Sequence, residues 1–277
     1  MQKVNYLNVG CGNKFHRAWT NVDMASSSPH VDVHNLLQGF PYPDGQFDVV
    51  YHSQVLEHVP KEKAAAFQRE CLRVLKPGGV LRVVVPDLEN IATEYLRHLR
   101  DNLERPSEVT AANYDWILLE MYDQTVRNRP EGQMGDFLKQ PQLPNEDYVV
   151  ERIGHVGRSI IARGRQQASA PAPRLFDRLR RITPRRLVSH LRIRVRNRLG
   201  SEALRIGMFR LGGEVHMWMY DRYSLGRLLR EAGFVDARRV DAHTSAVPDW
   251  AAYELDVKDG AVFDPTSLFM EARKPGV

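Results

Sequence analysis

The segment Val4-Asn5-Tyr6-Leu7-Asn8-Val9-Gly10-Cys11-Gly12 decides the fold. Its first six residues predict a buried strand, and its glycines predict a tight turn directly after that strand. Glycine lets the backbone approach a bound nucleoside because no Cβ stands in the way. Further along, Asn21-Val22-Asp23 predicts a second, short strand that ends in an acid. A carboxylate at that position can accept hydrogen bonds from both hydroxyls of a ribose.

Strands and helices alternate along much of the chain, which is typical of an α/β fold. Five further strands are predicted, within 30–37 and over 47–51, 80–85, 234–242 and 268–273. Helices are predicted over 61–75, 88–103, 111–126, 175–182, 184–199 and 223–233, and a flexible linker is predicted over 166–173. We therefore predict a doubly wound, mostly parallel seven-stranded sheet whose last strand is antiparallel. A core over 1–100, a helical Arg-rich insert over 101–213 and a C-terminal part over 214–277 that completes the sheet make up the expected organisation.

The glycine turn differs from a dinucleotide-binding fingerprint. Phe15 stands where that fingerprint has its third glycine, and Asp23 follows Gly12 by 11 residues instead of by about 20. Residues 13–20 also leave little room for the helix whose N-terminus would bind a pyrophosphate. The site is therefore predicted to hold a nucleoside without phosphates, a description that S-adenosylmethionine (SAM) meets.

Five motifs follow one another in the first third of the chain. They are Leu7–Gly12, Trp19–Asp23, Phe40–Val50, Val55–Val59 and Arg73–Gly79. Together they resemble the class I SAM-dependent methyltransferases, and most closely the small-molecule branch of that class. The resemblance implies the class I fold, SAM as cofactor and a methyltransferase activity (EC 2.1.1.-).

The resemblance also implies which residues bind SAM. They are Asn8, Gly10, Cys11, Gly12, Asp23, Asn35, Leu36, His52 and Ser53. The glycine turn would line the methionine and the ribose, Asp23 would bind the ribose, and His52 and Ser53 would line the methionine end. The family usually has an acid where this chain has Asn35, whose amide oxygen can accept the same hydrogen bond from the adenine amino group.

Two further segments carry a second resemblance. Residues 116–127 and 214–223 are similar to bacterial methyltransferases associated with cell-surface polysaccharide biosynthesis. This similarity implies O-methylation of a sugar hydroxyl, either on a surface glycan or on its nucleotide- or lipid-linked precursor.

Methyl transfer to a hydroxyl needs a proton acceptor, and histidine is the usual choice near neutral pH. His216 is the first candidate because it precedes the helix predicted over 223–233, among Trp and Tyr residues. The alternative is an aromatic lid with a structural histidine. His155 and Asp123 are the second candidates. No group of acids, His or Cys has metal-ligand spacing, so no metal site is predicted.

Positive charge is concentrated in one part of the chain. Residues 152–198 contain 14 Arg, no Lys and one acid, Asp177, which gives this stretch a charge of +13 in a chain of net charge +5. Three interpretations stay open. The stretch is a solvated insert, or it forms a membrane-surface helix pair over 174–198 that contacts anionic lipid. In the third interpretation it binds the phosphates of an activated sugar, a lipid-linked glycan or a nucleic acid. Phe176 is the one aromatic residue in the stretch, which does not favour nucleic acid.

The sequence shows no secretory signal and no apolar run of the roughly 18 residues that span a bilayer. Its two cysteines, Cys11 and Cys71, give no disulfide framework. We therefore expect a cytoplasmic protein, with peripheral contact at the inner membrane as an option. Two other functions stay open: an RNA or protein methyltransferase that uses the Arg-rich segment, and a non-catalytic SAM-binding regulator.

Overall fold

The computed structural model describes residues 4–26, 28–169 and 201–276. Its main sheet has seven strands, in the order β3-β2-β1-β4-β5-β9-β6. They are β1 (Tyr6–Val9), β2 (Thr20–Asp23), β3 (Asp32–Val33), β4 (Phe47–Ser53), β5 (Leu75–Pro86), β6 (Val235–Val240) and β9 (Ser267–Arg273). Strands β1 to β5 pair in parallel, whereas β9 is antiparallel to both of its neighbours, β5 and β6. The predicted fold class is confirmed, although the last strand lies inside the sheet and β6 forms the edge.

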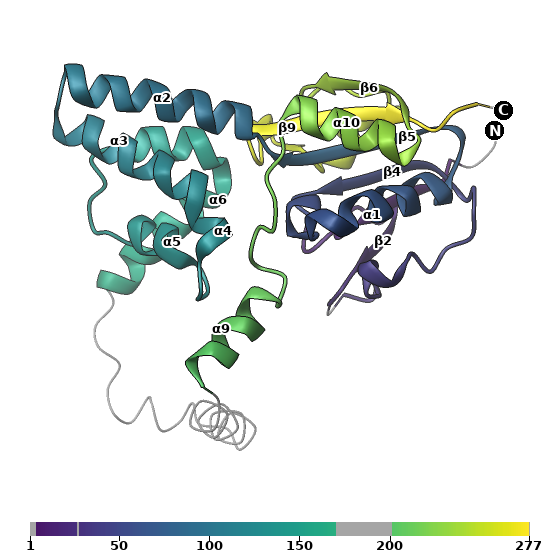
Figure 1. The fold of residues 1–277 in the computed structure, drawn as a ribbon, viewed down its shortest axis with the longest axis horizontal. Coiled ribbons are helices and arrows are strands. Elements are labelled where there is room, and N and C mark those ends of the chain that lie inside the picture. Colours follow the sequence, from purple (N-terminus) through teal and green to yellow (C-terminus); the bar gives the residue numbers. More distant parts are fainter. Residues whose placement is uncertain (1–3, 27, 170–200, 277) are drawn as a thin grey trace.

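Two helices cover one face of the sheet (Figure 1). Helix α1 (Lys61–Val74) connects β4 to β5, and α10 (Arg222–Ala232) precedes β6. Asp221 caps the start of α10 with its side chain, and Gly233 ends that helix at a φ of 105°, a left-handed conformation that favours glycine. Apolar side chains of both helices pack on alternate residues of the strands, which places one core between the helices and the sheet.

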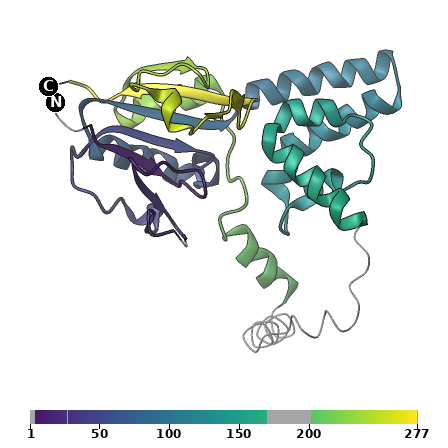
Figure 2. The same cartoon turned by 180° about the vertical axis from the view of Figure 1, so that it is seen from behind.

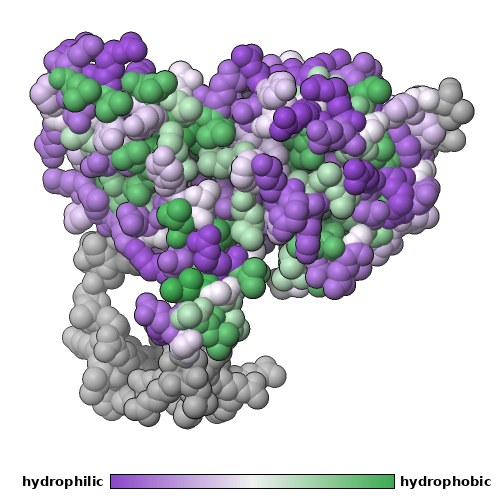
Figure 3. All heavy atoms as spheres, viewed as in Figure 1, coloured by the Kyte–Doolittle hydropathy of each residue, from purple (hydrophilic) through white to green (hydrophobic). Residues whose placement is uncertain are grey.

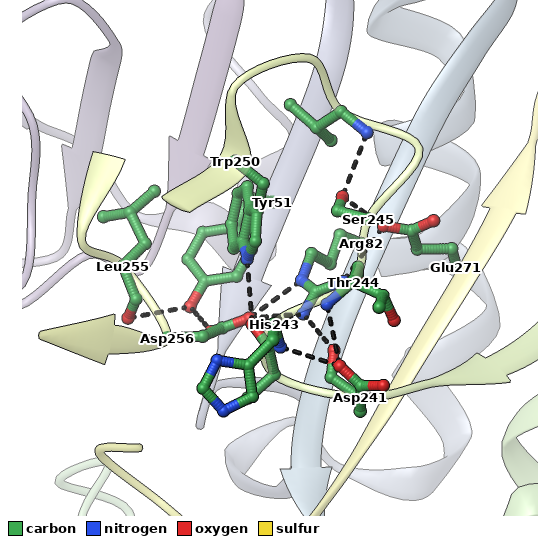
Figure 4. A network of polar contacts seen from close by, with 12 residues as sticks. Tyr51, Arg82, Asp241, His243, Thr244, Ser245, Trp250, Leu255, Asp256 and Glu271 are labelled. Carbon is green, nitrogen blue, oxygen red and sulfur yellow. Dashed lines mark hydrogen bonds and ion pairs between the residues drawn. The ribbon is translucent and has the colours of Figure 1, made fainter. Parts of the chain in front are cut away.

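The opposite face is covered by the segment that follows β6, and not by a helix layer. This segment carries the one-turn helix η4 (Trp250–Tyr253) and a hairpin of β7 (Val257–Lys258) and β8 (Ala261–Val262). Arg82 of β5 is fully buried beneath it and forms ion pairs with Asp256 at 2.7 Å and Glu271 at 3.0 Å. The guanidinium group also donates to the backbone carbonyls of Asp241 and Thr244, at 2.8 and 2.9 Å (Figure 4). One buried cation thus ties this covering segment to the centre of the sheet.

A helical insert lies beside the sheet, joined to it at the C-terminal end of β5 (Figures 1 and 2). It comprises α2 (Leu88–Glu104), α3 (Glu108–Leu118), a π-helical turn (Leu119–Asp123), α4 (Gln124–Val126), α5 (Gly132–Leu138) and α6 (Glu146–Ser169). Helix α9 (Glu202–Arg210) follows and leads back to the sheet. The helices predicted over 88–103 and 111–126 are present, but α5, α6 and α9 were not predicted.

Helix α6 corrects one prediction from composition. Residues 166–173 were expected to form a linker, but Gln166 to Ser169 continue α6. The basic helices predicted over 175–182 and 184–199, and with them the proposed membrane segment 174–198, lie outside the described residues. No helix of the described chain is both long and apolar enough to cross a bilayer.

The insert contacts the sheet through the loop that leads into β9. Gly154, at a φ of 57°, interrupts α6 where the helix meets that loop, and a Cβ there would lie 2.8 Å from the carbonyl oxygen of Phe263. The hydroxyl of Thr266 donates to the carbonyl of Arg152 at 3.1 Å. These two close approaches fix the insert against the C-terminal ends of the parallel strands.

Candidate active site

The turn after β1 has the short form predicted from its sequence, because no helix forms between β1 and β2. Buried asparagines hold it in place instead. The side-chain amide of Asn8 donates to the carbonyl of Lys14 at 3.0 Å. Asn21 donates to the carbonyls of His16 and Trp19, at 3.1 and 2.9 Å. Asn8 therefore positions the turn through its side-chain amide nitrogen.

Gly10 and Gly12 have different roles in this turn. Both have a positive φ, of 67° and 52°. A Cβ on Gly10 would lie 2.4 Å from a methyl group of Val55, so this glycine lets the segment after β4 pack against the turn. A Cβ on Gly12 would meet nothing within 4 Å, so the turn is open there. Cys11, between them, is buried, and burial raises the pKa of its thiol to about 12.

Asp23 lies beside the open side of the turn, at the end of β2. Its Oδ2 accepts a hydrogen bond of 2.8 Å from the backbone N–H of Gly12, and its Oδ1 accepts one of 3.3 Å from Ala25. Each carboxylate oxygen keeps a second lone pair that can accept from a ribose hydroxyl. The open turn and this carboxylate are compatible with the ribose of SAM, and ribose binding by Asp23 stays a prediction.

Asn35 and Leu36 follow β3, where the adenine was expected. Leu36 is buried and begins the short helix η1 (Leu36–Gln38). The side-chain oxygen of Asn35 caps that helix by accepting from the N–H of Leu37 at 3.1 Å. The oxygen expected to meet the adenine amino group is therefore already engaged, although its second lone pair remains.

His52 and Ser53 end β4, and both were predicted to line the methionine end of SAM. Alternation along the strand turns His52 into the core beneath α1, where it is fully buried and its Nε2 lies 3.1 Å from the amide of Gln68. Burial lowers the pKa of His52 to about 4. The structure thus does not bring the His52 side chain to the strand ends, whereas Ser53 and then Gln54 lie there.

Gln54 is a residue that the sequence did not single out. It has a φ of 55°, which is uncommon for a residue with a side chain and often marks functional sites. Its amide donates to the hydroxyl of Ser267 at 2.9 Å. Its position directly after a buried strand was the signal that could have identified it.

A cavity of about 340 Å³ opens between the strand ends and the insert. Gln54, Asp87, His216 and Ser267 line it from the sheet side, and Gln124 and Arg127 line it from the insert. Apolar residues such as Ile91 and Leu138 complete its wall. The cavity combines an apolar lining with a few convergent polar groups, as ligand sites in proteins do.

His216 lies at this cavity and is almost fully buried. Its Nε2 is 3.2 Å from the amide nitrogen of Gln124, and its ring meets that of His58 edge-on, with 4.7 Å between the ring centroids. Burial, and then the neighbouring His58, lower the pKa of His216 to about 3. Its imidazole is therefore neutral at pH 7, where it can accept a hydrogen bond but is a weak base.

Of the two other predicted catalytic residues, only the side chain of Asp123 is described, and it lies outside the cavity lining. Asp123 is buried in the insert, where it forms an ion pair of 2.8 Å with Arg127 and accepts from the N–H of Gln133 at 2.7 Å. Asp123 does not line the cavity with His216, although its partner Arg127 does. His155 belongs to α6, and its side chain lies outside the described part of the structure.

Comparisons with known proteins match part of the chain to methyltransferases. Residues 16–83 match the family described as a methyltransferase domain. A probable SAM-dependent methyltransferase of Mycolicibacterium smegmatis is 47% identical over 60 residues, which are 21% of this chain and 23% of that protein. The 2-methyl-6-phytyl-1,4-hydroquinone methyltransferase of Synechocystis sp. is 50% identical over 42 residues, 15% of this chain and 13% of that protein. The chain thus covers less than a quarter of the length of these relatives.

Among solved structures, a SAM-dependent methyltransferase from Archaeoglobus fulgidus aligns with 99% of this chain and 87% of its own, at 12% identity and a TM-score of 0.39. The family match and the order of the seven strands lead to one conclusion. The chain carries a class I methyltransferase domain, for which SAM is the cofactor.

Proposed function

We propose that this protein transfers the methyl group of SAM to a sugar hydroxyl, on a bacterial surface glycan or on its activated precursor. The cavity between the strand ends and the insert carries the proposal. It adjoins the ends of β4 and β5 and presents amide, carboxylate and imidazole groups. Such groups suit an acceptor that is rich in hydroxyls, because each can exchange hydrogen bonds with a hydroxyl. The similarity of residues 116–127 and 214–223 to polysaccharide-associated methyltransferases also supports this acceptor class.

SAM, when bound, supplies a methyl group on a positively charged sulfur. The residues of the chain then have to bind and align the two reactants, and alignment alone can contribute roughly 7–11 kcal/mol. We assign SAM binding to the Gly10–Gly12 turn and Asp23, and acceptor binding to Gln54, Gln124 and His216. Ser53 is the last residue of β4, and we assign it to the methionine end of SAM.

We assign His216 to direct contact with the acceptor hydroxyl, because it is the one predicted catalytic side chain that lines the cavity among the described residues. Asp123 acts through Arg127, which lines the cavity and forms an ion pair with Asp123. His155 stays a second candidate.

Peripheral contact with anionic lipid is a further part of the proposal. Helix α9 follows the Arg-rich segment 174–198 in the sequence, and Leu204 and Met208 in the helix and Leu211 directly after it are exposed. Figure 3 shows apolar side chains on α9, below the body of the molecule. Apolar side chains beside clustered Arg are typical of a surface that attaches to membranes. A liposome pull-down that is unchanged by deletion of 174–198 would contradict this part.

The test of the function is release of S-adenosylhomocysteine with a panel of nucleotide sugars, lipid-linked sugars, RNA and protein. We expect turnover with the sugars only, and a loss of roughly 2- to 10-fold in His216→Ala, which is the contribution of one hydrogen bond to the acceptor. His243→Ala, at an exposed histidine outside the cavity, is the control. Turnover with RNA or protein would favour the alternative that uses the Arg-rich segment. Binding of SAM without turnover on any acceptor would favour a regulator.

A further inference from the structure

Three side chains that can bind a metal meet behind the wall of the cavity. Glu57 and His58 lie in the one-turn helix η2 (Leu56–His58) after β4, and His216 lies in the segment that enters α10. One ligand atom from each of the three lies within 4.8 Å of the others. We call these residues the Glu57 cluster. The sequence predicted no metal site, because the first two residues and the third are far apart along the chain.

Backbone hydrogen bonds hold the two segments together. The carbonyl of Glu57 accepts from the N–H groups of Met217 and Trp218, at 2.6 and 3.2 Å. The N–H of His216 donates to the carbonyl of Gln124 at 2.9 Å. The Glu57 cluster is therefore placed by main-chain contacts that involve each segment, and not by chance side-chain positions on a surface.

Glu57 differs from the other buried carboxylates that the structure describes in the sheet and the insert. Asp256 and Glu271 face Arg82, Asp123 faces Arg127, Glu120 faces Arg152, and Asp87 faces Arg239. Glu57 is fully buried, and neither of its carboxyl oxygens has a hydrogen-bond partner among the described residues. A buried polar group without a partner is costly and calls for an explanation. A bound cation would supply the missing partner.

His58 already has the tautomer that a metal ligand needs. Its Nδ1 lies 3.2 Å from the carbonyl oxygen of Val215, and because a carbonyl only accepts, Nδ1 carries the proton. The lone pair of His58 is therefore on Nε2. Histidines that bind metals usually donate their other N–H to a carbonyl or carboxylate in this way.

We propose that the Glu57 cluster binds one divalent transition metal of the Zn²⁺ type, with Glu57, His58 and His216 as ligands. Two histidines and a glutamate are a ligand set of catalytic zinc sites, which keep a further position open. His216 and Gln124 line the cavity, so the open position faces the acceptor. Imidazole ligands favour Zn²⁺ and related ions over Mg²⁺ or Ca²⁺, which prefer oxygen.

The role of the metal rests on the proposed function. With the metal bound, His216 would hold the ion, and the ion in place of the imidazole would contact the acceptor hydroxyl. A Lewis acid at this position, beside the cavity, acidifies that hydroxyl. The hydroxyl proton passes to water, and the oxygen forms a bond to the methyl carbon. The bond between that carbon and sulfur breaks, and its electron pair stays on sulfur. The products are a methyl ether and S-adenosylhomocysteine, with no change in the oxidation state of the metal.

Metal binding is tested without reference to turnover. The full chain is treated with a chelator and dialysed, and Zn²⁺ is then titrated by calorimetry, with Co²⁺ absorption as a second readout. We expect one ion per chain. Loss of one ligand should weaken binding by at least roughly 10- to 100-fold, in Glu57→Gln and in His216→Ala. His98→Gln changes a buried histidine outside the cluster and should bind the ion as the original chain does.

Each variant is first compared with the original chain by circular dichroism and thermal unfolding, and Glu57→Gln is chosen because it keeps the size of the side chain. No uptake of Zn²⁺ or Co²⁺ by the folded chain overturns the metal site. Equal uptake by the folded Glu57→Gln and His216→Ala variants overturns it as well. Methyl transfer that persists in the chelator-treated chain overturns the role of the metal and leaves the proposed function standing. Tight metal binding without methyl transfer on any acceptor supports the site and counts against the function.

Discussion

The backbone N–H of Gly12 and the carboxylate of Asp23 are joined by a hydrogen bond of 2.8 Å. This contact links the turn after β1 to the end of β2, and it leaves the carboxylate beside the open side of the turn. The side chain that is expected to hold the ribose therefore also holds the backbone that lines the same site.

We expect Asp23→Ala to weaken binding of SAM and of S-adenosylhomocysteine by roughly 10- to 100-fold. Hydrogen bonds to a charged group contribute about 1.5–3 kcal/mol each, and the variant loses those to the ribose. Isothermal titration calorimetry measures the change. Asp136→Asn removes an exposed carboxylate of the insert that pairs with Arg129 and should bind as before. Equal affinities for all three chains would remove Asp23 from the site.

The two glycines of the turn should respond differently to alanine. A left-handed conformation costs a residue with a Cβ about 1–2 kcal/mol, which is the expected loss in Gly12→Ala. Gly10→Ala adds overlap with Val55, for which overpacking costs about 1–3 kcal/mol more. Urea unfolding of both variants checks this order. The double variant Gly10→Ala/Val55→Ala should recover part of the additional loss, and an absence of recovery would mean that Val55 is not the obstacle.

Patterns of apolar residues predicted β1, β2, β4, β5 and β9 well because most residues of these strands are buried. The two-residue strand β3 was found only approximately, since both of its residues are exposed. The insert was predicted less well. Helix α6 is interrupted at Gly154 by a contact with the loop before β9. A contact between segments that are distant in the sequence cannot be predicted from the pattern of neighbouring residues.

In the site, too, contacts between residues close in the sequence could be predicted, and contacts between distant segments could not. The Gly10–Gly12 turn and Asp23 were predictable because the turn and the strand that follows it are close in the sequence. The core position of His52 was available from the alternation of β4, which places it on the same face as Val50. The Glu57 cluster could not be predicted from the sequence, because only the path of the chain through the insert and back brings His216 to Glu57.

His52 should make the fold sensitive to acid. Its pKa is about 4 in the folded chain and about 6.5 in an unfolded one, so the folded state binds fewer protons. The stabilisation that neutral His52 contributes is complete above pH 6.5. It is lost as the pH falls towards about 4, the pKa of His52 in the folded chain. Between pH 7.5 and 4.5 the unfolding free energy should fall by about 2.5 kcal/mol more than in His52→Gln. Urea unfolding at both pH values measures this, and equal losses would place the acid sensitivity elsewhere.

Arg82 is expected to be essential for stability and not for binding. Arg82→Met leaves Asp256 buried without its cation and leaves Glu271 only the exposed Arg238, at 3.7 Å. Such a change typically destabilises by about 3–5 kcal/mol. The variant should also free the segment around Trp250, whose ring lies 4.6 Å from the guanidinium carbon. Thermal unfolding checks the loss, and limited proteolysis checks the segment. Arg129→Met breaks an exposed pair with Asp136 and should cost at most about 1 kcal/mol; a similar loss in the two variants would contradict this assignment.

Asp123 should affect the acceptor and leave SAM binding unchanged. Its carboxylate pairs with Arg127 and accepts from Gln133 at the start of α5, and Arg127 and the α5 residues Met134 and Gly135 line the cavity. Removing one partner of a buried ion pair costs about 3–5 kcal/mol, so Asp123→Asn is preferred to alanine because it keeps the shape and the contact with Gln133. We expect this variant to raise KM for the acceptor more than it lowers kcat.

The affinity for SAM, measured by calorimetry, should stay within a factor of two or so, because SAM is assigned to the other side of the cavity. A fall in kcat with KM unchanged would instead mean that Asp123 acts on the reacting atoms, which is the catalytic role predicted from the sequence.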